Sequence, residues 1–75
     1  MLKLPCLSGK ETVTILEKAG FKVVRRRGSH VVMKKETPSG VIGCVIPLHK
    51  ELATGTLRGI LKQAQLSPEE FITFR

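Results

Sequence analysis

Two short turn-forming breaks between apolar segments, in the middle of this 75-residue sequence, restrict its fold more than any other feature. Phe21–Arg27 and His30–Lys34 are both rich in apolar residues, and only Gly28 and Ser29 separate them. A glycine-first pair of this kind is favoured in tight hairpin turns. Residues 37–40 (Thr-Pro-Ser-Gly) form a second break before a third apolar segment, Val41–Ile46. Neither break is long enough for a crossover helix, so we predict an antiparallel three-stranded meander.

A helix is predicted before these strands. Ser8 and Glu11 have the spacing of a capping box, and Gly20 follows the last apolar residue of the helical pattern. These two signals predict a helix that begins at residue 9 and ends at residue 19. In the third strand, Gly43 is expected to mark either a bulge or the close approach of a helix.

Two further helices are predicted after the strands. Thr54 is expected to cap the first of them, in which four apolar residues recur at i, i+3, i+4 and i+7: Leu57, Ile60, Leu61 and Ala64. Ser67 and Pro68 then open a short terminal helix in which Phe71 faces the core. The order of elements predicts an α+β fold, with residues 1–75 forming one domain and both longer helices on one face of the sheet.

Composition limits the class of protein. A hydrophobic content of 41% is sufficient for a folded domain and argues against a basic disordered tail. The sequence has neither an apolar run of about 18 residues nor the apolar stretch of a signal peptide, so we expect a soluble, cytoplasmic protein. Cys6 and Cys44 lie in no metal-binding spacing and are expected to be reduced and partly buried. We expect no metal site and no cofactor.

The positive charge is concentrated on the predicted hairpin. The chain has a net charge of +7, and the segment from Lys22 to Lys35 holds six cations and no acid. One or two charges would protect an exposed strand against aggregation, so six favour a polyanionic partner. The only aromatic residues are three Phe, which disfavours a stacking platform for single strands. Contact with the backbone and shape of RNA fits this composition better.

His30 is the strongest candidate for chemistry. It follows the predicted turn and the three consecutive arginines, Arg25, Arg26 and Arg27. An imidazole accepts protons near neutral pH, and neighbouring cations bind phosphate and stabilise a phosphoryl transition state. RNA supplies its own nucleophile, the 2′-hydroxyl, so His30 is a candidate general base for RNA cleavage. His49 is either an ordinary surface residue or a general acid for the leaving oxygen.

Three motifs together resemble the HicA toxin family of toxin–antitoxin systems. They are residues 28–30 (GSH), residues 46–49 (IPLH) and residues 55–64 (GTLRGILKQA), and the resemblance extends over roughly residues 8–71. It implies a fold like the double-stranded-RNA-binding domain and an mRNA-cleaving toxin, or mRNA interferase, that needs no metal and is inhibited by a HicB-type antitoxin. It also implies that His30 is the residue required for activity, that Gly28 and Ser29 form the turn presenting it, and that His49 and Lys50 match a segment after the third strand.

This sequence departs from the family pattern at two places. Gln65 stands where the family usually has glycine, and the segment between Pro47 and Leu52 is slightly shorter than in many members. We predict that His30 is catalytic and that seven residues bind RNA: Arg25, Arg26, Arg27, Gly28, Ser29, Lys35 and Lys50. Two alternatives remain open, a non-catalytic RNA-binding module and a basic adaptor that docks on an acidic protein surface.

Overall fold

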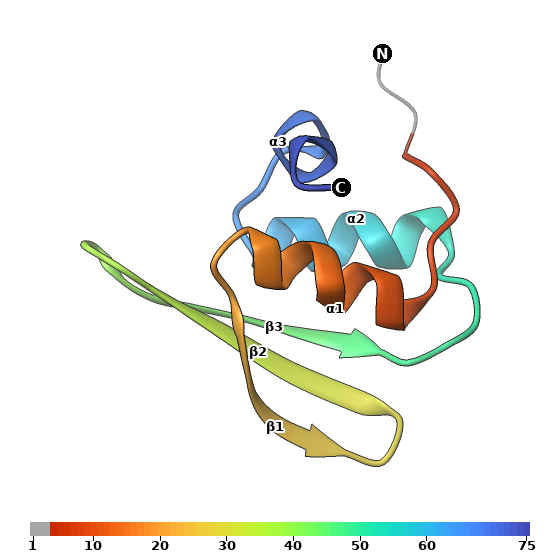
Figure 1. Ribbon diagram of the computed structural model, residues 1–75, viewed down its shortest axis with the longest axis horizontal. Helices are drawn as coiled ribbons and strands as arrows, with labels where there is room; N and C mark the ends of the chain where they lie inside the picture. Colours follow the sequence, from red (N-terminus) through yellow and green to blue (C-terminus); the bar gives the residue numbers. More distant parts are fainter. Residues whose placement is uncertain (1–3) are drawn as a thin grey trace.

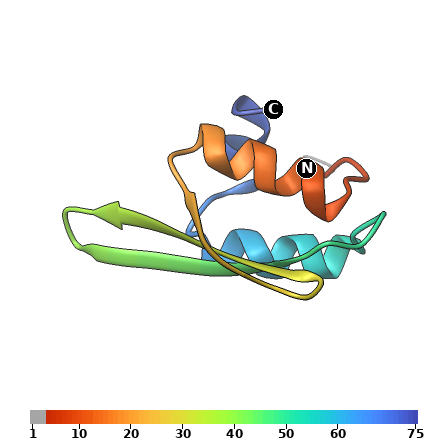
Figure 2. The same ribbon diagram turned by 60° about the horizontal axis from the view of Figure 1, so that its bottom comes forward.

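Three helices and one antiparallel sheet make up the computed structural model, which describes residues 4–75. The elements follow in the order α1 (Gly9–Lys18), β1 (Lys22–Arg27), β2 (His30–Thr37), β3 (Gly40–Pro47), α2 (Thr54–Gln63) and α3 (Pro68–Thr73). Both α1 and α2 lie on one side of the sheet, whose strand order is β1-β2-β3 (Figures 1 and 2). The predicted α+β layout and meander are confirmed.

The ends of α1 follow the predicted signals. Glu11 N–H donates to the Ser8 hydroxyl at 3.0 Å, and Ser8 N–H donates to the Glu11 carboxylate at 3.0 Å. Hydrogen bonding of the Glu11 carboxylate to the Ser8 backbone, and then to the Ser8 side chain, holds the pKa of Glu11 below its ordinary value. At the other end Gly20 adopts φ 102°, and Phe21 N–H reaches back to Leu16 O at 3.0 Å. This is a Schellman ending with glycine in the left-handed position.

The start of α2 differs from the prediction. Ala53 is the N-cap and no side chain caps this helix, so the assignment of Thr54 as the cap is wrong. The backbone of Ala53 is still extended, at φ −60° and ψ 147°, which places Thr54 inside the first turn. α2 ends like α1: Gln65 has φ 57°, and Leu66 N–H donates to Leu61 O at 3.0 Å. α2 therefore ends with a left-handed residue although that residue is a glutamine.

A bulge and a regular ladder shape the sheet. The register between β1 and β2 shifts between Val23 and Arg25, so the bulge falls at Val24. Val24 is the second residue of a valine doublet, and Val31 and Val32 form another in β2. β2 and β3 pair without interruption from His30 opposite Pro47 to Thr37 opposite Gly40. Gly43 pairs with Lys34 within this ladder and is exposed, so neither role predicted for this glycine holds.

The core lies between the sheet and the helices. Alternate residues of β2 and β3 are buried on the helix side: Val31, Met33, Cys44 and Ile46. The apolar residues predicted for α2 are all buried, and Phe71 of α3 is fully buried. Cys44 is a free thiol in this core, whereas Cys6 is exposed, so the prediction of partial burial is wrong for Cys6. Within residues 4–75, the opposite face of the sheet carries no helix (Figure 2).

Candidate nucleic-acid interface

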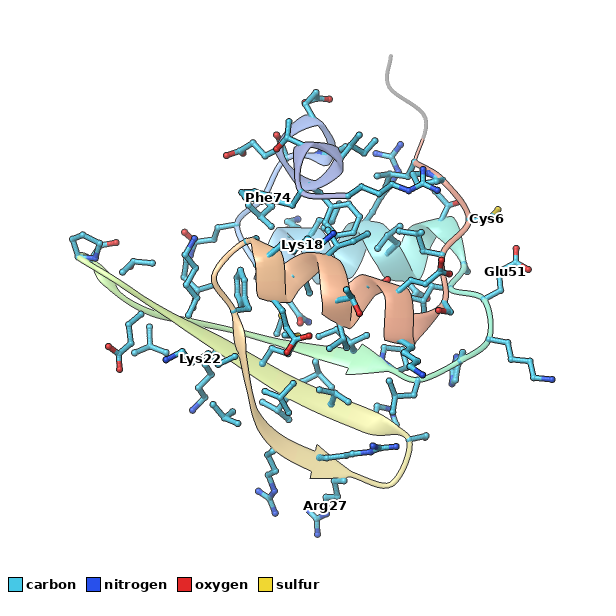
Figure 3. All side chains as sticks on the ribbon, in the orientation of Figure 1. Cys6, Lys18, Lys22, Arg27, Glu51 and Phe74 are labelled. Atoms are coloured by element: carbon cyan, nitrogen blue, oxygen red, sulfur yellow. The ribbon has the colours of Figure 1, made fainter. Side chains whose placement is uncertain are left out.

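The sheet register places His30 on the face that the helices leave open. Residues alternate between the two faces of a strand, and directly paired residues share a face. Val31 is buried on the helix side, so His30 and its partner Arg27 lie on the open side. Arg25 pairs with Val32 and joins the same open side. Figure 3 shows Arg27 pointing away from the helices.

The same register divides the block of cations between two faces. Lys22 and Lys34 pair with each other on the open side, where they extend the surface that carries His30. Arg26 pairs with the buried Val31 and therefore lies on the helix side. The three consecutive arginines do not form one cluster, because neighbouring residues of a strand point to opposite faces.

Lys35 also lies away from His30. Its ammonium group donates to Ala19 O at 2.8 Å and lies 5.8 Å from the centre of the Phe21 ring. A cation at the carboxyl end of a helix stabilises the helix dipole and its last carbonyl groups. Lys35 thus anchors β2 to the end of α1.

The turn before His30 is held in place by the segment that contains His49. Gly28 has φ 57°, which suits the first position of a two-residue hairpin turn. Ser29 O accepts a hydrogen bond of 2.6 Å from Leu48 N–H. His49 O in turn accepts a hydrogen bond of 2.9 Å from Gly9 N–H. The predicted motifs around His30 and His49 are therefore brought to the same end of the sheet.

Gly9 packs beneath the candidate site, a contact that the sequence did not predict. A Cβ atom on Gly9 would lie 2.0 Å from Pro47 O and 2.8 Å from Leu48 Cα. Only glycine lets the start of α1 pack this closely against the segment that bonds to the turn. Its place directly after the capping serine gave no signal of this contact, because the partner residues lie some 40 positions later in the chain.

The candidate site is an exposed surface. His30, His49 and Lys50 are all solvent-exposed, and His49 lies two residues beyond the strand partner of His30. Within residues 4–75, no three His, Cys, Asp or Glu side chains gather in a way that would hold a metal ion. None of the helices in the same range is long and apolar enough to cross a membrane. The surface offers an imidazole beside several cations.

Comparison with known protein families shows where this chain belongs. The family model described as the HicA toxin of bacterial toxin–antitoxin systems matches residues 9–66. The chain belongs to the HicA toxin family. The matched residues run from the start of α1 to the end of the α2 cap and include every predicted site residue of this HicA-family protein. No curated protein matches the sequence at a significant level.

Proposed function

We propose that this HicA-family protein is an endoribonuclease toxin that cleaves mRNA without a metal ion and is inhibited by a HicB-type antitoxin. Membership of the toxin family supports the toxin role. The observation that carries the chemistry is the position of His30, exposed at a hairpin turn and sharing the open face with Arg25 and Arg27. A general base beside cations is what cleavage through the 2′-hydroxyl of RNA requires.

The proposed reaction begins when the His30 imidazole takes the proton of a ribose 2′-hydroxyl. The resulting oxygen attacks the adjacent phosphorus, and the bond from phosphorus to the 5′-oxygen breaks. The products are a 2′,3′-cyclic phosphate and a 5′-hydroxyl end. Arg25 and Arg27 stabilise the negative charge that develops on the phosphoryl oxygens. His49 is the candidate donor of the proton that the leaving oxygen needs.

RNA binding is proposed for the open face and the turn. Arg25, Arg27, Gly28, Ser29 and Lys50 keep the role that the sequence suggested, and Lys22 and Lys34 join them because the register brings them to the same face. Arg26 and Lys35 lie on the helix side. We therefore leave these two outside the proposed phosphate contacts.

The test is cleavage of labelled RNA in the presence of EDTA. Wild-type protein is expected to produce fragments that end in a cyclic phosphate, and His30→Ala is expected to produce none. The His30 side chain is exposed, so the variant should fold, which circular dichroism would verify. Full cleavage by folded His30→Ala would refute the assignment. The pH profile of His49→Ala tests the proton donor, because an unchanged profile removes His49 from the reaction.

A non-catalytic RNA-binding module is the second candidate. One observation favours it: none of the hydrogen bonds within residues 4–75 involves the His30 imidazole, whereas catalytic bases are commonly oriented by a third group. Such a module would retard RNA in a gel and leave it intact. The shift would weaken steeply as salt rises, because phosphate contacts release counterions.

A further inference from the structure

β1 is the open edge of the sheet. Among residues 4–75 it pairs only with β2, and all six of its residues are exposed. The opposite edge is partly covered, because Val45 N–H of β3 donates to the Gln63 amide oxygen of α2 at 3.2 Å. The backbone hydrogen bonds made outside the sheet by residues 4–75 include none from residues 22–27. An edge strand of this kind presents unpaired N–H and C=O groups to an incoming strand.

A groove runs beside this edge on the helix side, between α1 and β1. It has a volume of about 410 Å³ and is lined by Lys10, Val13, Val23, Arg26, Val31 and Leu48. Four of these side chains are aliphatic, and Val23 is 44% exposed. Lys10 from α1 and Arg26 from β1 supply two cations. The groove therefore suits an apolar side chain with negative charge close by.

The two faces of β1 differ in a way that selects the incoming strand. A strand added to this edge would place alternate side chains in the apolar groove and the others on the open face. The open face of β1 carries Lys22, Arg25 and Arg27. Acidic side chains fit there, and a second copy of this +7 chain would be repelled.

We propose that β1 binds an extended segment of a partner protein in which apolar and acidic residues alternate. The apolar side chains would lie in the groove and the acidic ones among the cations of the open face. The proposal rests on the partner that toxin–antitoxin membership implies, and it does not depend on RNA cleavage. RNA fits the groove less well, because its walls are aliphatic and contain no aromatic side chain for base stacking.

The test uses a short acetylated and amidated peptide in which glutamate and leucine alternate. Its binding to the full chain is followed by amide NMR shifts. We expect shifts along β1 and around Val13, and at least tenfold weaker binding to Val23→Ser and Arg26→Glu. Lys62→Glu is the matched control: it changes the net charge as Arg26→Glu does, lies on the exposed side of α2, and should bind normally. A peptide methylated on alternate backbone nitrogens should lose binding, because it cannot complete the strand ladder.

Other outcomes would overturn the proposal. A control peptide has the same composition, with its glutamates in one block and its leucines in another. If it binds equally well, net charge explains the binding and the alternation does not. Shifts of the groove amides on adding oligouridylate, with none on adding the peptide, would make the groove an RNA subsite. Shifts that depend on protein concentration alone would identify a second copy as the occupant. Peptide binding by a protein that leaves RNA intact would keep this proposal and refute the proposed ribonuclease.

Discussion

Gly9→Ala tests how the start of α1 supports the candidate site. The added Cβ would lie 2.0 Å from Pro47 O, about 1.4 Å short of the 3.4 Å at which ordinary contact begins. The backbone fixes the position of the Cβ atom, and Pro47 O is itself a backbone atom, so no side-chain rotation relieves the clash. The segment around Leu48 must move away, and this movement strains the bonds from Gly9 N–H to His49 O and from Leu48 N–H to Ser29 O.

The expected loss of stability is large for so small a protein. Each hydrogen bond contributes about 0.5–1.5 kcal/mol, and overpacking costs about 1–3 kcal/mol. Overpacking and the two hydrogen bonds together give about 2–6 kcal/mol, out of the roughly 4–11 kcal/mol expected for a domain of this length. Because 1 kcal/mol shifts Tm by about 4–8 °C in domains of this size, we expect Tm to fall by at least about 8 °C.

Thermal and urea unfolding followed by circular dichroism would measure this loss. Gly59→Ala is the matched control, since Gly59 lies inside α2 with open space around it. Alanine favours the helix and should raise the free energy of unfolding by as much as about 1 kcal/mol. At a temperature where Gly9→Ala remains folded, the Ser29 amide should shift and RNA cleavage should fall by about 10²-fold. A wild-type Tm would refute the close packing. A lower Tm without a change in the NMR shift of the Ser29 amide would refute the claim that Gly9 supports the turn.

Two further predictions concern the helix end and the buried thiol. Gln65→Gly should raise the free energy of unfolding by about 0.5–1 kcal/mol, because the strain of a left-handed backbone at φ 57° is relieved and only part of this gain is lost to unfolded-state entropy. Gln65→Ala keeps the Cβ atom and should bring no gain in urea unfolding. An equal gain in both variants would assign the effect to the glutamine side chain instead. Burial raises the pKa of the Cys44 thiol to about 11. Iodoacetamide at pH 8 should therefore label Cys6 quickly, and Cys44 only at the rate at which the core opens; mass spectrometry of the modified peptides would measure both, and equal rates would contradict the burial of Cys44.

Most of the fold was predictable because its signals are local. The Ser8–Glu11 capping box, the Gly28 turn and the apolar stripe of α2 each involve residues a few positions apart, and the structure confirms all three. The assignment of Thr54 failed because a capping residue and a first-turn residue share the same preferences, and the position of one boundary decides between them. The prediction of a bulge or a close helix at Gly43 failed because glycine also occurs at ordinary exposed positions of a strand ladder.

The residue types of the candidate site are visible in the sequence, whereas their arrangement in space is not. His30 and the family motifs are visible in the chain, as is the excess of cations on the hairpin. Which face each cation takes was not visible, because the valine doublets obscure the alternation and the bulge at Val24 changes the phase of β1. Only the paired register shows that Arg25 and Arg27 accompany His30, whereas Arg26 turns toward the groove.

Long-range contacts explain what remained hidden in the chain. Lys35 resembles the other cations of its segment until the fold brings it to Ala19 O, and Gly9 resembles any first-turn residue until Pro47 packs against it. Local sequence specifies a basic α+β domain with a histidine at a turn, because caps, turns and periodicity act over a few residues. The division of its charge between two faces, and the support beneath the turn, arise only when distant segments pack together.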